Sequence, residues 1–123
     1  MGNVKVFFDT YALYEIVKGN PDYSSYLDEK GFTTIFHLAE FYYAILREYG
    51  ADMAEELYFE FHEFAQPVDD EIIIEAMQFR FKNKKKKLSY ADSIGYIYAE
   101  KHKIKFVTGD KEFEGLPNTE FIK

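Results

Sequence analysis

Four carboxylates stand where an acid contributes little to folding and could contribute much to metal chemistry. Asp9 follows the apolar run at 4–8, and Asp110 follows the one at 104–108. Asp92 falls in the first turn of an expected helix, and Glu40 falls inside another. Ligands bind beyond the carboxyl ends of strands in open α/β sheets, so we expect the four acids to meet there. Because crowded carboxylates repel unless a proton or cation intervenes, they predict a Mg²⁺ or Mn²⁺ site.

Each of these acids also has an ordinary structural explanation. Asp9 could cap the following helix, and Asp110 could be a turn residue. Asp92 could sit at the third helical position, where the helix dipole favours an acid. Glu40 could simply be exposed, because Arg47, seven residues along, is beyond the usual range of a helical ion pair.

The elements that must position these acids follow from apolar periodicity and turn residues. Short strands alternate with amphipathic helices, which predicts one domain over 1–123, a three-layer α/β/α sandwich with a short parallel sheet. The expected strands are 4–8, 32–35, 66–68, 104–108 and 119–122. The expected helices are 11–17 with Thr10 as its cap, 22–30, 36–49 closed by Gly50, 51–64, a helix capped by Asp69 and running to 81, and 89–103.

The composition excludes several classes of protein. The 123 residues are 47% hydrophobic, which argues against disorder, and no run is long and apolar enough to span a bilayer. There are no cysteines, hence no disulfide framework and no thiolate metal site. With no signal-peptide pattern at the start, we expect a cytoplasmic protein.

The charge is unevenly distributed. The net charge of −7 argues against a general nucleic-acid binder. A basic run nevertheless precedes Asp92, and it consists of Arg80, Lys82, Lys84, Lys85, Lys86 and Lys87. We expect the last four lysines to contact RNA phosphates, which positions a strand without reading its bases. The alternative is a solvated loop with no binding role.

Considered together, the motifs resemble those of PIN-domain ribonucleases. The resemblance rests on Phe8-Asp9-Thr10, Glu40 within a helix, Ala91-Asp92-Ser93-Ile94, and Thr108-Gly109-Asp110-Lys111-Glu112-Phe113. It covers essentially the whole chain, whose size resembles the VapC toxins of VapBC toxin–antitoxin pairs. It implies a Mg²⁺- or Mn²⁺-dependent endoribonuclease with Asp9, Glu40, Asp92 and Asp110 at the site. A hydroxyl from Thr108, together with Thr10 and Glu112 as further candidates, completes the implied set.

The residue types suit metal-assisted hydrolysis. No Ser-His-Asp set or glycine-rich phosphate loop is visible, and His37, His62 and His102 all fall on expected helices. A metal lowers the pKa of water and stabilises charge on phosphate oxygens, so carboxylates need only hold one or two ions and orient water. Two rival hypotheses remain, a housekeeping PIN nuclease of RNA processing or decay and a non-catalytic acidic binding domain. A receiver domain fits less well, because Asp9 lacks an acidic neighbour.

The 13 Phe and 11 Tyr residues favour core and interface packing over base stacking. Aromatic and apolar side chains are dense on the helices around Glu40, more than one small core hides: Tyr11, Leu13, Tyr14, Tyr23, Tyr26, Tyr43, Tyr58 and Phe59. We therefore expect a homodimer that presents a groove for an amphipathic helix. The resemblance to VapC toxins implies that an antitoxin supplies this helix.

Overall fold

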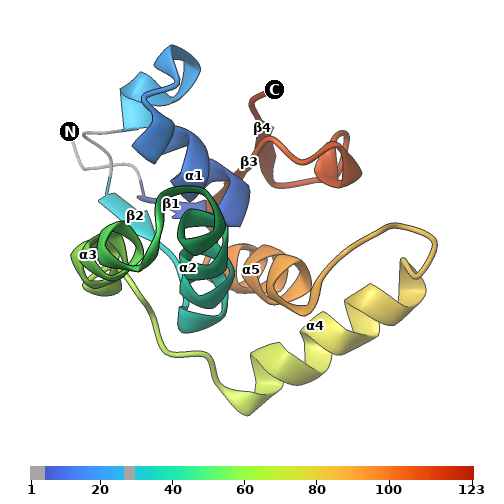
Figure 1. The fold of residues 1–123 in the computed structure, drawn as a ribbon. Coiled ribbons are helices and arrows are strands. Elements are labelled where there is room, and N and C mark those ends of the chain that lie inside the picture. Colours follow the sequence, from blue (N-terminus) through green and yellow to red (C-terminus); the bar gives the residue numbers. More distant parts are fainter. Residues whose placement is uncertain (1–4, 27–29) are drawn as a thin grey trace.

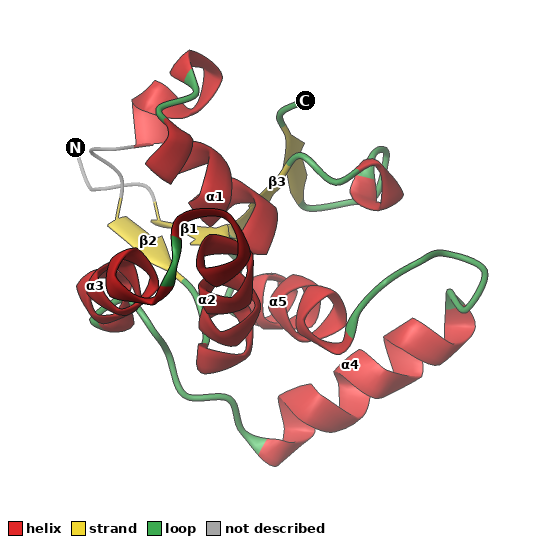
Figure 2. Ribbon diagram, in the orientation of Figure 1, coloured by secondary structure: helices red, strands yellow, loops and turns green. Residues whose placement is uncertain are grey.

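The computed structural model describes residues 5–26 and 30–123. Its strands are β1 (Lys5–Phe8), β2 (Lys30–Phe32), β3 (Lys105–Thr108) and β4 (Thr119–Phe121) (Figure 1). Its α-helices are α1 (Thr10–Lys18), α2 (Ile35–Tyr49), α3 (Ala51–His62), α4 (Asp70–Lys82) and α5 (Tyr90–Lys101), and two short 3₁₀ helices are η1 (Pro21–Tyr26) and η2 (Lys111–Phe113) (Figure 2). The expected start of the first strand at Val4 lies outside the described residues.

The sheet is parallel throughout, as predicted, with the strand order β2-β1-β3-β4. The chain leaves β1 toward β2 on one side and leaves β3 toward β4 on the other. The order of strands therefore reverses between β1 and β3, which are neighbours in the sheet. In an open parallel sheet such a switch point opens a crevice beyond the carboxyl ends of the strands. Asp9 and Asp110 follow those two ends.

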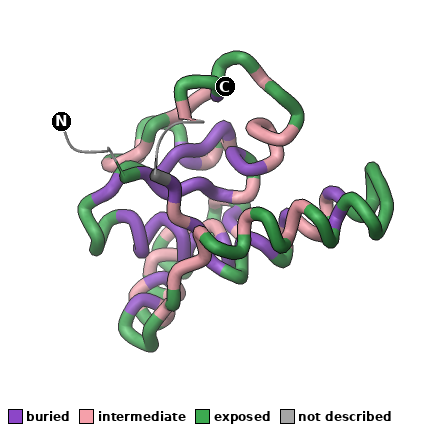
Figure 3. The backbone as a smooth tube through the Cα atoms, turned by 90° about the vertical axis from the view of Figure 1, so that its left-hand side faces the viewer, coloured by how far each residue is buried: buried purple, intermediate pink, exposed green. Residues whose placement is uncertain are grey.

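Alternate residues of the strands face two separate cores. Phe7 and Phe106 pack with α4 and α5, whereas Val6, Phe8 and Val107 pack with α1, α2 and α3. This period of two is what a sheet covered on both faces requires. Buried residues accordingly follow the strands and the inner helix faces, while outer faces and connections are exposed (Figure 3). The predicted three-layer α/β/α arrangement is confirmed.

The segment before β2 differs from the prediction. The helix expected over 22–30 is the 3₁₀ helix η1, and Lys30 already belongs to β2, while residues 27–29 lie outside the described part. Local side-chain bonds explain why no α-helix forms. Asn20 Oδ1 accepts the N–H of Asp22 at 2.9 Å, and Ser24 Oγ donates to Pro21 O at 2.8 Å. Such bonds offer the backbone an alternative to helical hydrogen bonds.

The strands expected over 32–35 and 66–68 are also corrected. Thr34 accepts the N–H groups of Phe36 and His37 and so starts α2, which ends the strand at Phe32. In the described chain the segment 66–68 joins no sheet, and only an isolated bridge links Thr33 to Ala65. Pro67 has no N–H for a ladder. The helix expected over 51–64 ends at His62, and the one expected over 89–103 is Tyr90–Lys101 with Ser89 as its cap.

Two of the apolar residues expected at the surface belong to the core. Leu13 and Tyr23 are each 1% exposed, because both pack into the core that contains Val6 and Phe8 of β1, and Tyr23 Oη donates to the backbone oxygen of Ile122 at 2.8 Å. The prediction that Asp69 caps a helix is confirmed by its bond from Ile72 N at 3.0 Å. Within the described chain, no helix combines the length and the hydropathy needed to cross a bilayer.

Candidate acidic site

Asp9 starts α1 and is almost completely buried. Its Oδ1 accepts the N–H of Ala12 at 2.8 Å, so Asp9 and not Thr10 is the N-cap, which corrects the prediction. The cap forms because the residue leaves β1 in extended geometry and its short carboxylate reaches the third helical N–H. Only 1% of Asp9 is exposed, so this carboxylate is held inside the molecule at the end of the strand.

Asp92 starts α5 within a reciprocal capping box. Ser89 Oγ accepts the N–H of Asp92 at 3.0 Å, and Asp92 Oδ2 accepts the N–H of Ser89 at 2.8 Å. Two otherwise unpaired donors of the helix end are satisfied in this way. The arrangement leaves Asp92 Oδ1 available for another partner.

Asp110 is fixed by the turn that follows β3. Its N–H donates to Thr108 Oγ1 at 3.0 Å, and its Oδ1 accepts the N–H of Glu112 at 2.9 Å. Gly109 between them is required by space. A Cβ there would lie 2.2 Å from Tyr11 Cε1 and 2.6 Å from the backbone oxygen of Ile122. The missing side chain lets α1 and β4 close around the end of β3.

Glu40 is linked to the site and is not simply exposed. Thr10 Oγ1 donates to Glu40 Oε1 at 3.0 Å, which joins the start of α1 to α2. Glu40 is half-buried, and its charge raises the pKa of Asp92. The hydroxyls of Thr10 and Thr108 thus both lie among the acids, as the motifs imply.

Burial raises the pKa of two of the acids, Asp9 and Asp92. Burial, as the main cause, raises the pKa of Asp9 from 3.8 to about 8, and the charges of Asp92 and Asp110 raise it further, against hydrogen bonds from Thr108 and Ala12 that lower it. Burial likewise raises the pKa of Asp92 to about 6, opposed by the N–H of Ser89. A set of acids that resists ionisation in the absence of a cation is suited to binding one.

The site opens into a pocket of about 420 Å³. Asp9, Asp92 and Asp110 line it together, and the lining also includes Glu15, Glu48 and Arg47, whose guanidinium lies over the Tyr43 ring. Sequence reasoning missed Arg47. The available signal was its spacing, because it stands two helical turns beyond Glu40 and so lies on the same face of α2. A cation beside carboxylates suits a phosphate group that approaches them.

His37 is a second residue whose position sequence reasoning missed. Thr34 Oγ1 already accepts two backbone N–H groups, so its proton donates to His37 Nδ1 at 2.7 Å, and Nε2 carries the imidazole hydrogen. Nε2 has no hydrogen bond of good geometry, although the backbone of Ala91 raises the pKa of His37 as an acceptor would. Burial, the larger effect, lowers that pKa to about 3, so the ring stays neutral.

This imidazole also fixes the distance between α2 and α5. A Cβ on Gly95 would lie 2.5 Å from His37 Nε2 and 2.8 Å from Phe7 Cε1. The ring therefore fills the space that glycine leaves, one turn from Asp92. The backbone carbonyl of His37 accepts a hydrogen bond from Thr10 Oγ1 at 3.4 Å. His37 thus connects the three helices that carry Asp9, Glu40 and Asp92.

The four lysines expected to bind RNA lie outside the acidic pocket. Lys84, Lys85 and Lys87 are exposed in the connection between α4 and α5. Lys86 is half-buried, and its Nζ donates to the backbone oxygen of Glu112 at 3.0 Å. That bond brings the connection to within two residues of Asp110.

The chemical type of the donors suits a divalent metal, but their arrangement in the described chain does not yet form a ligand set. Among the described residues, no three His, Asp or Glu side chains are gathered as a metal-binding group. One oxygen of each aspartate accepts a backbone N–H of its own helix start, which turns the three carboxylates toward different helices. The remaining oxygens are carboxylate oxygens, the ligand type that Mg²⁺ and Mn²⁺ prefer, although they are not gathered around one point in the part of the chain that the structure describes.

Comparison with known proteins gives a match to one family and to several solved folds. The family model described as "PIN domain" matches residues 6–118. No curated protein gives a significant sequence match. Several solved structures, including the following three, have similar folds. A toxin–antitoxin complex from Klebsiella pneumoniae matches with TM-score 0.71 and 18% identity over 94% of this chain and 95% of that one.

The other two structures come from different bacteria. Mycobacterium tuberculosis VapC20, a toxin that cleaves the sarcin–ricin loop, matches with TM-score 0.73 and 12% identity over 89% of this chain and 91% of that one. VapBC2 from Rickettsia felis, bound to a promoter DNA fragment, matches with TM-score 0.73 and 17% identity over 98% and 100%. At these identities the similarity establishes the fold.

Proposed function

Because the chain belongs to the PIN-domain family, we propose that it is an endoribonuclease that uses Mg²⁺ or Mn²⁺ at the acidic site. One observation carries the proposal. Three aspartates from separate elements line one pocket at the switch point between β1 and β3. Burial that raises the pKa of Asp9 and Asp92 opposes their ionisation unless a cation joins them.

The roles of the residues follow from their hydrogen bonds. Asp9, Asp92 and Asp110 would hold the metal through oxygens that their caps leave available. Glu40, oriented by Thr10, would orient water or a second ion. Thr108 lowers the pKa of Asp9 by its hydrogen bond and keeps that carboxylate in place.

A bound Mg²⁺ or Mn²⁺ supplies water of lowered pKa and neutralises charge on the phosphate. Arg47, whose guanidinium lies over the Tyr43 ring with its carbon 5.1 Å from the ring centre, lines the same pocket and would have to turn from that ring to bind a phosphate group. His37, neutral and enclosed, takes no part in proton transfer and serves the packing of α2 on α5.

The test is cleavage of a single-stranded RNA by the purified chain. We expect cleavage with Mg²⁺ or Mn²⁺, none after EDTA treatment, and none with Asp92→Asn in either metal. Circular dichroism of the variant controls for folding. Cleavage that persists in EDTA, or in a folded Asp92→Asn variant at the wild-type rate, would contradict the proposed site.

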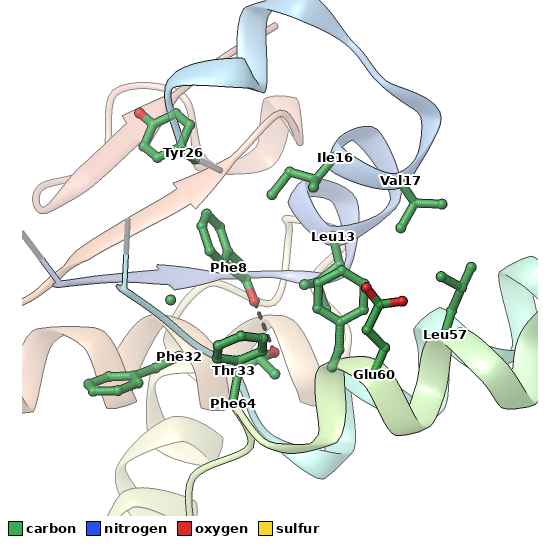
Figure 4. A pocket seen from close by; sticks show the side chains of 12 residues that line it. Phe8, Leu13, Ile16, Val17, Tyr26, Phe32, Thr33, Leu57, Glu60 and Phe64 are labelled. Carbon is green, nitrogen blue, oxygen red and sulfur yellow. Dashed lines mark hydrogen bonds between the residues drawn. The ribbon is translucent and has the colours of Figure 1, made fainter. Parts of the chain in front are cut away.

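We propose further that the chain is the toxin of a toxin–antitoxin pair. The three similar structures described above are toxins or toxin–antitoxin complexes. An apolar groove of about 400 Å³ lies between α1, β2 and α3 (Figure 4), and none of the four acids of the candidate site lines it. Leu13, Val17 and Leu57 line it, and Glu60 stands at its rim. Apolar walls between two helices fit the apolar face of an amphipathic antitoxin helix.

The partner test uses the small protein encoded beside this chain. Co-expression should give a stable complex without ribonuclease activity, and Leu57→Asp should break the complex while leaving cleavage intact. Met53→Asp is the control, because Met53 is exposed on the same helix but does not line the groove, and this variant should keep the complex. Full activity in the presence of the neighbouring protein would favour the housekeeping nuclease instead.

A homodimer is the remaining part of the proposed assembly. Large apolar side chains are exposed on several helices, including Tyr43 at 60%, Phe59 at 69% and Ile74 at 58%. Exposed apolar groups at this density support an interface. Sedimentation analysis should show twice the monomer mass, and a monomer at high concentration would remove the dimer from the proposal.

A further inference from the structure

Two aromatic side chains stand exposed where α4 passes into α5. Phe81 is 71% exposed near the end of α4, and Tyr90 is 62% exposed at the start of α5. Neither ring belongs to the two apolar cores. Single exposed aromatic side chains are common on protein surfaces, so the groups around these two rings decide whether they could bind a partner.

A cation covers one face of each ring. The guanidinium carbon of Arg80 lies 4.3 Å from the centre of the Tyr90 ring, and Lys84 Nζ lies 5.0 Å from that of Phe81. Arg80 is itself fixed, because its Nε donates to Leu88 O at 2.9 Å. The Tyr90 ring is therefore held in orientation without being buried, and most of its surface remains available.

The charge around these rings is strongly positive. Six of the eight residues from Arg80 to Lys87 are Arg or Lys, in a chain whose net charge is −7. In the described part, none of the six forms an ion pair with a carboxylate. Beside Phe81 lies a cavity of about 330 Å³ lined by Met77, Arg80, Lys84, Lys86 and Leu88. This combination of free positive charge and open rings suits a polyanion that also carries flat apolar groups.

The basic segment Arg80–Lys87 and its two rings are linked to the acidic site along the chain and through hydrogen bonds. Tyr90 precedes Asp92 by two residues on α5. Lys86 Nζ contacts the backbone of Glu112, whose own N–H donates to Asp110 Oδ1. RNA bound across Phe81 and Tyr90 would thus lie on segments that are linked to two of the acids, Asp92 and Asp110.

We infer that Tyr90, with Phe81 beside it, is a stacking platform for bases of single-stranded RNA next to the cleaved bond. The inference rests on the proposed ribonuclease function and adds residues that select the form of the substrate. Lys84, Lys85 and Lys87 follow the phosphates, while the rings accept unpaired bases, which a duplex does not offer. The rings thus favour a single strand, and stacking alone carries little preference for sequence.

The test measures binding without cleavage. Fluorescence anisotropy in EDTA compares a labelled RNA 12-mer with an abasic ribose-phosphate strand of the same length. Wild type should bind the RNA more tightly than the abasic strand. Tyr90→Ala should bind the RNA about tenfold more weakly and lose the preference for bases, the size expected for one lost stacked base. Tyr90→Phe should keep the preference.

Matched variants separate stacking from charge and folding. Tyr49→Ala removes a tyrosine of similar exposure, 51%, at the end of α2, and should bind like wild type. Replacement of Lys84, Lys85 and Lys87 by Gln should weaken both strands equally. Equal loss of both strands in Tyr90→Ala, or displacement of RNA by polyglutamate at equal concentration, would overturn the platform while leaving a cleaving enzyme intact. A wild-type chain that neither binds nor cleaves RNA would instead refute the ribonuclease.

Discussion

Asparagine at position 9 is expected to stabilise the metal-free protein while it abolishes cleavage. In Asp9→Asn the amide oxygen still accepts the N–H of Ala12, as Asp9 Oδ1 does at 2.8 Å. The cap of α1 is therefore kept, and the charge that burial opposes is removed. The acidic site loses one of its three aspartates, so activity with Mg²⁺ should fall to background.

The size of the stabilisation follows from the pKa of Asp9. Burial raises it from 3.8 to about 8, so the native protein holds a proton that the unfolded chain has released between those values. One pKa unit corresponds to about 1.4 kcal/mol, which gives a penalty of about 4 kcal/mol at pH 7 as an upper value. Because the native state binds more protons, the free energy of unfolding of wild type should fall as pH rises from 4 to 8.

The assay is urea unfolding in EDTA at pH 5, 7 and 9, followed by circular dichroism. The advantage of Asp9→Asn over wild type should widen with pH, and added Mg²⁺ should stabilise wild type more than the variant. Asp52→Asn, at an exposed position in the first turn of α3, is the matched control. An advantage that stays constant from pH 5 to 9 would refute the argument, because it would show that Asp9 is not held protonated.

Three further outcomes follow from the same contacts. Asp92→Asn should also stabilise the metal-free fold, by less than Asp9→Asn because burial raises the pKa of Asp92 only to about 6, and urea unfolding at pH 7 gives the ranking. Gly95→Ala should destabilise the protein by about 1–3 kcal/mol, because the new Cβ meets His37 at 2.5 Å; an unchanged urea midpoint would contradict the close packing. Replacement of Lys84, Lys85, Lys86 and Lys87 by Gln should reduce the slope of log K for RNA binding against the logarithm of the KCl concentration by roughly 0.7 for each lost phosphate contact. An unchanged slope would show that these lysines form a solvated loop without a role in binding.

Residues placed by the sheet were predictable from the sequence. An acid directly after a buried apolar strand has few places to go, so Asp9 and Asp110 were found at the strand ends that the structure shows. The periodic helix predicted over 36–49, which the structure starts one residue earlier, and the cap at Asp69 were equally predictable, because each depends on contacts within a few residues. Order along the chain, together with parallel pairing, was enough to place the acids at one edge.

Residues placed by packing between helices were not predictable. Arg47 reaches the pocket wall only because α2 lies beside α1, and His37 matters only because α5 leaves space at Gly95. The 3₁₀ turn at η1 was missed because hydrogen bonds of Asn20 and Ser24 outweigh helix propensity there. Such contacts depend on distances between segments that no local pattern encodes.

The double use of the aspartates has an evolutionary consequence. Asp9 and Asp110 accept N–H groups at helix starts, and Asp92 completes a capping box, so each carboxylate serves the fold as well as the proposed chemistry. Asparagine can replace aspartate as a cap almost without loss, whereas alanine costs about 1 kcal/mol. A single Asp→Asn change would thus abolish the proposed cleavage and leave the groove between α1 and α3 intact. If the proposed antitoxin binds that groove, such an inactive descendant would still sequester it and would act as a decoy.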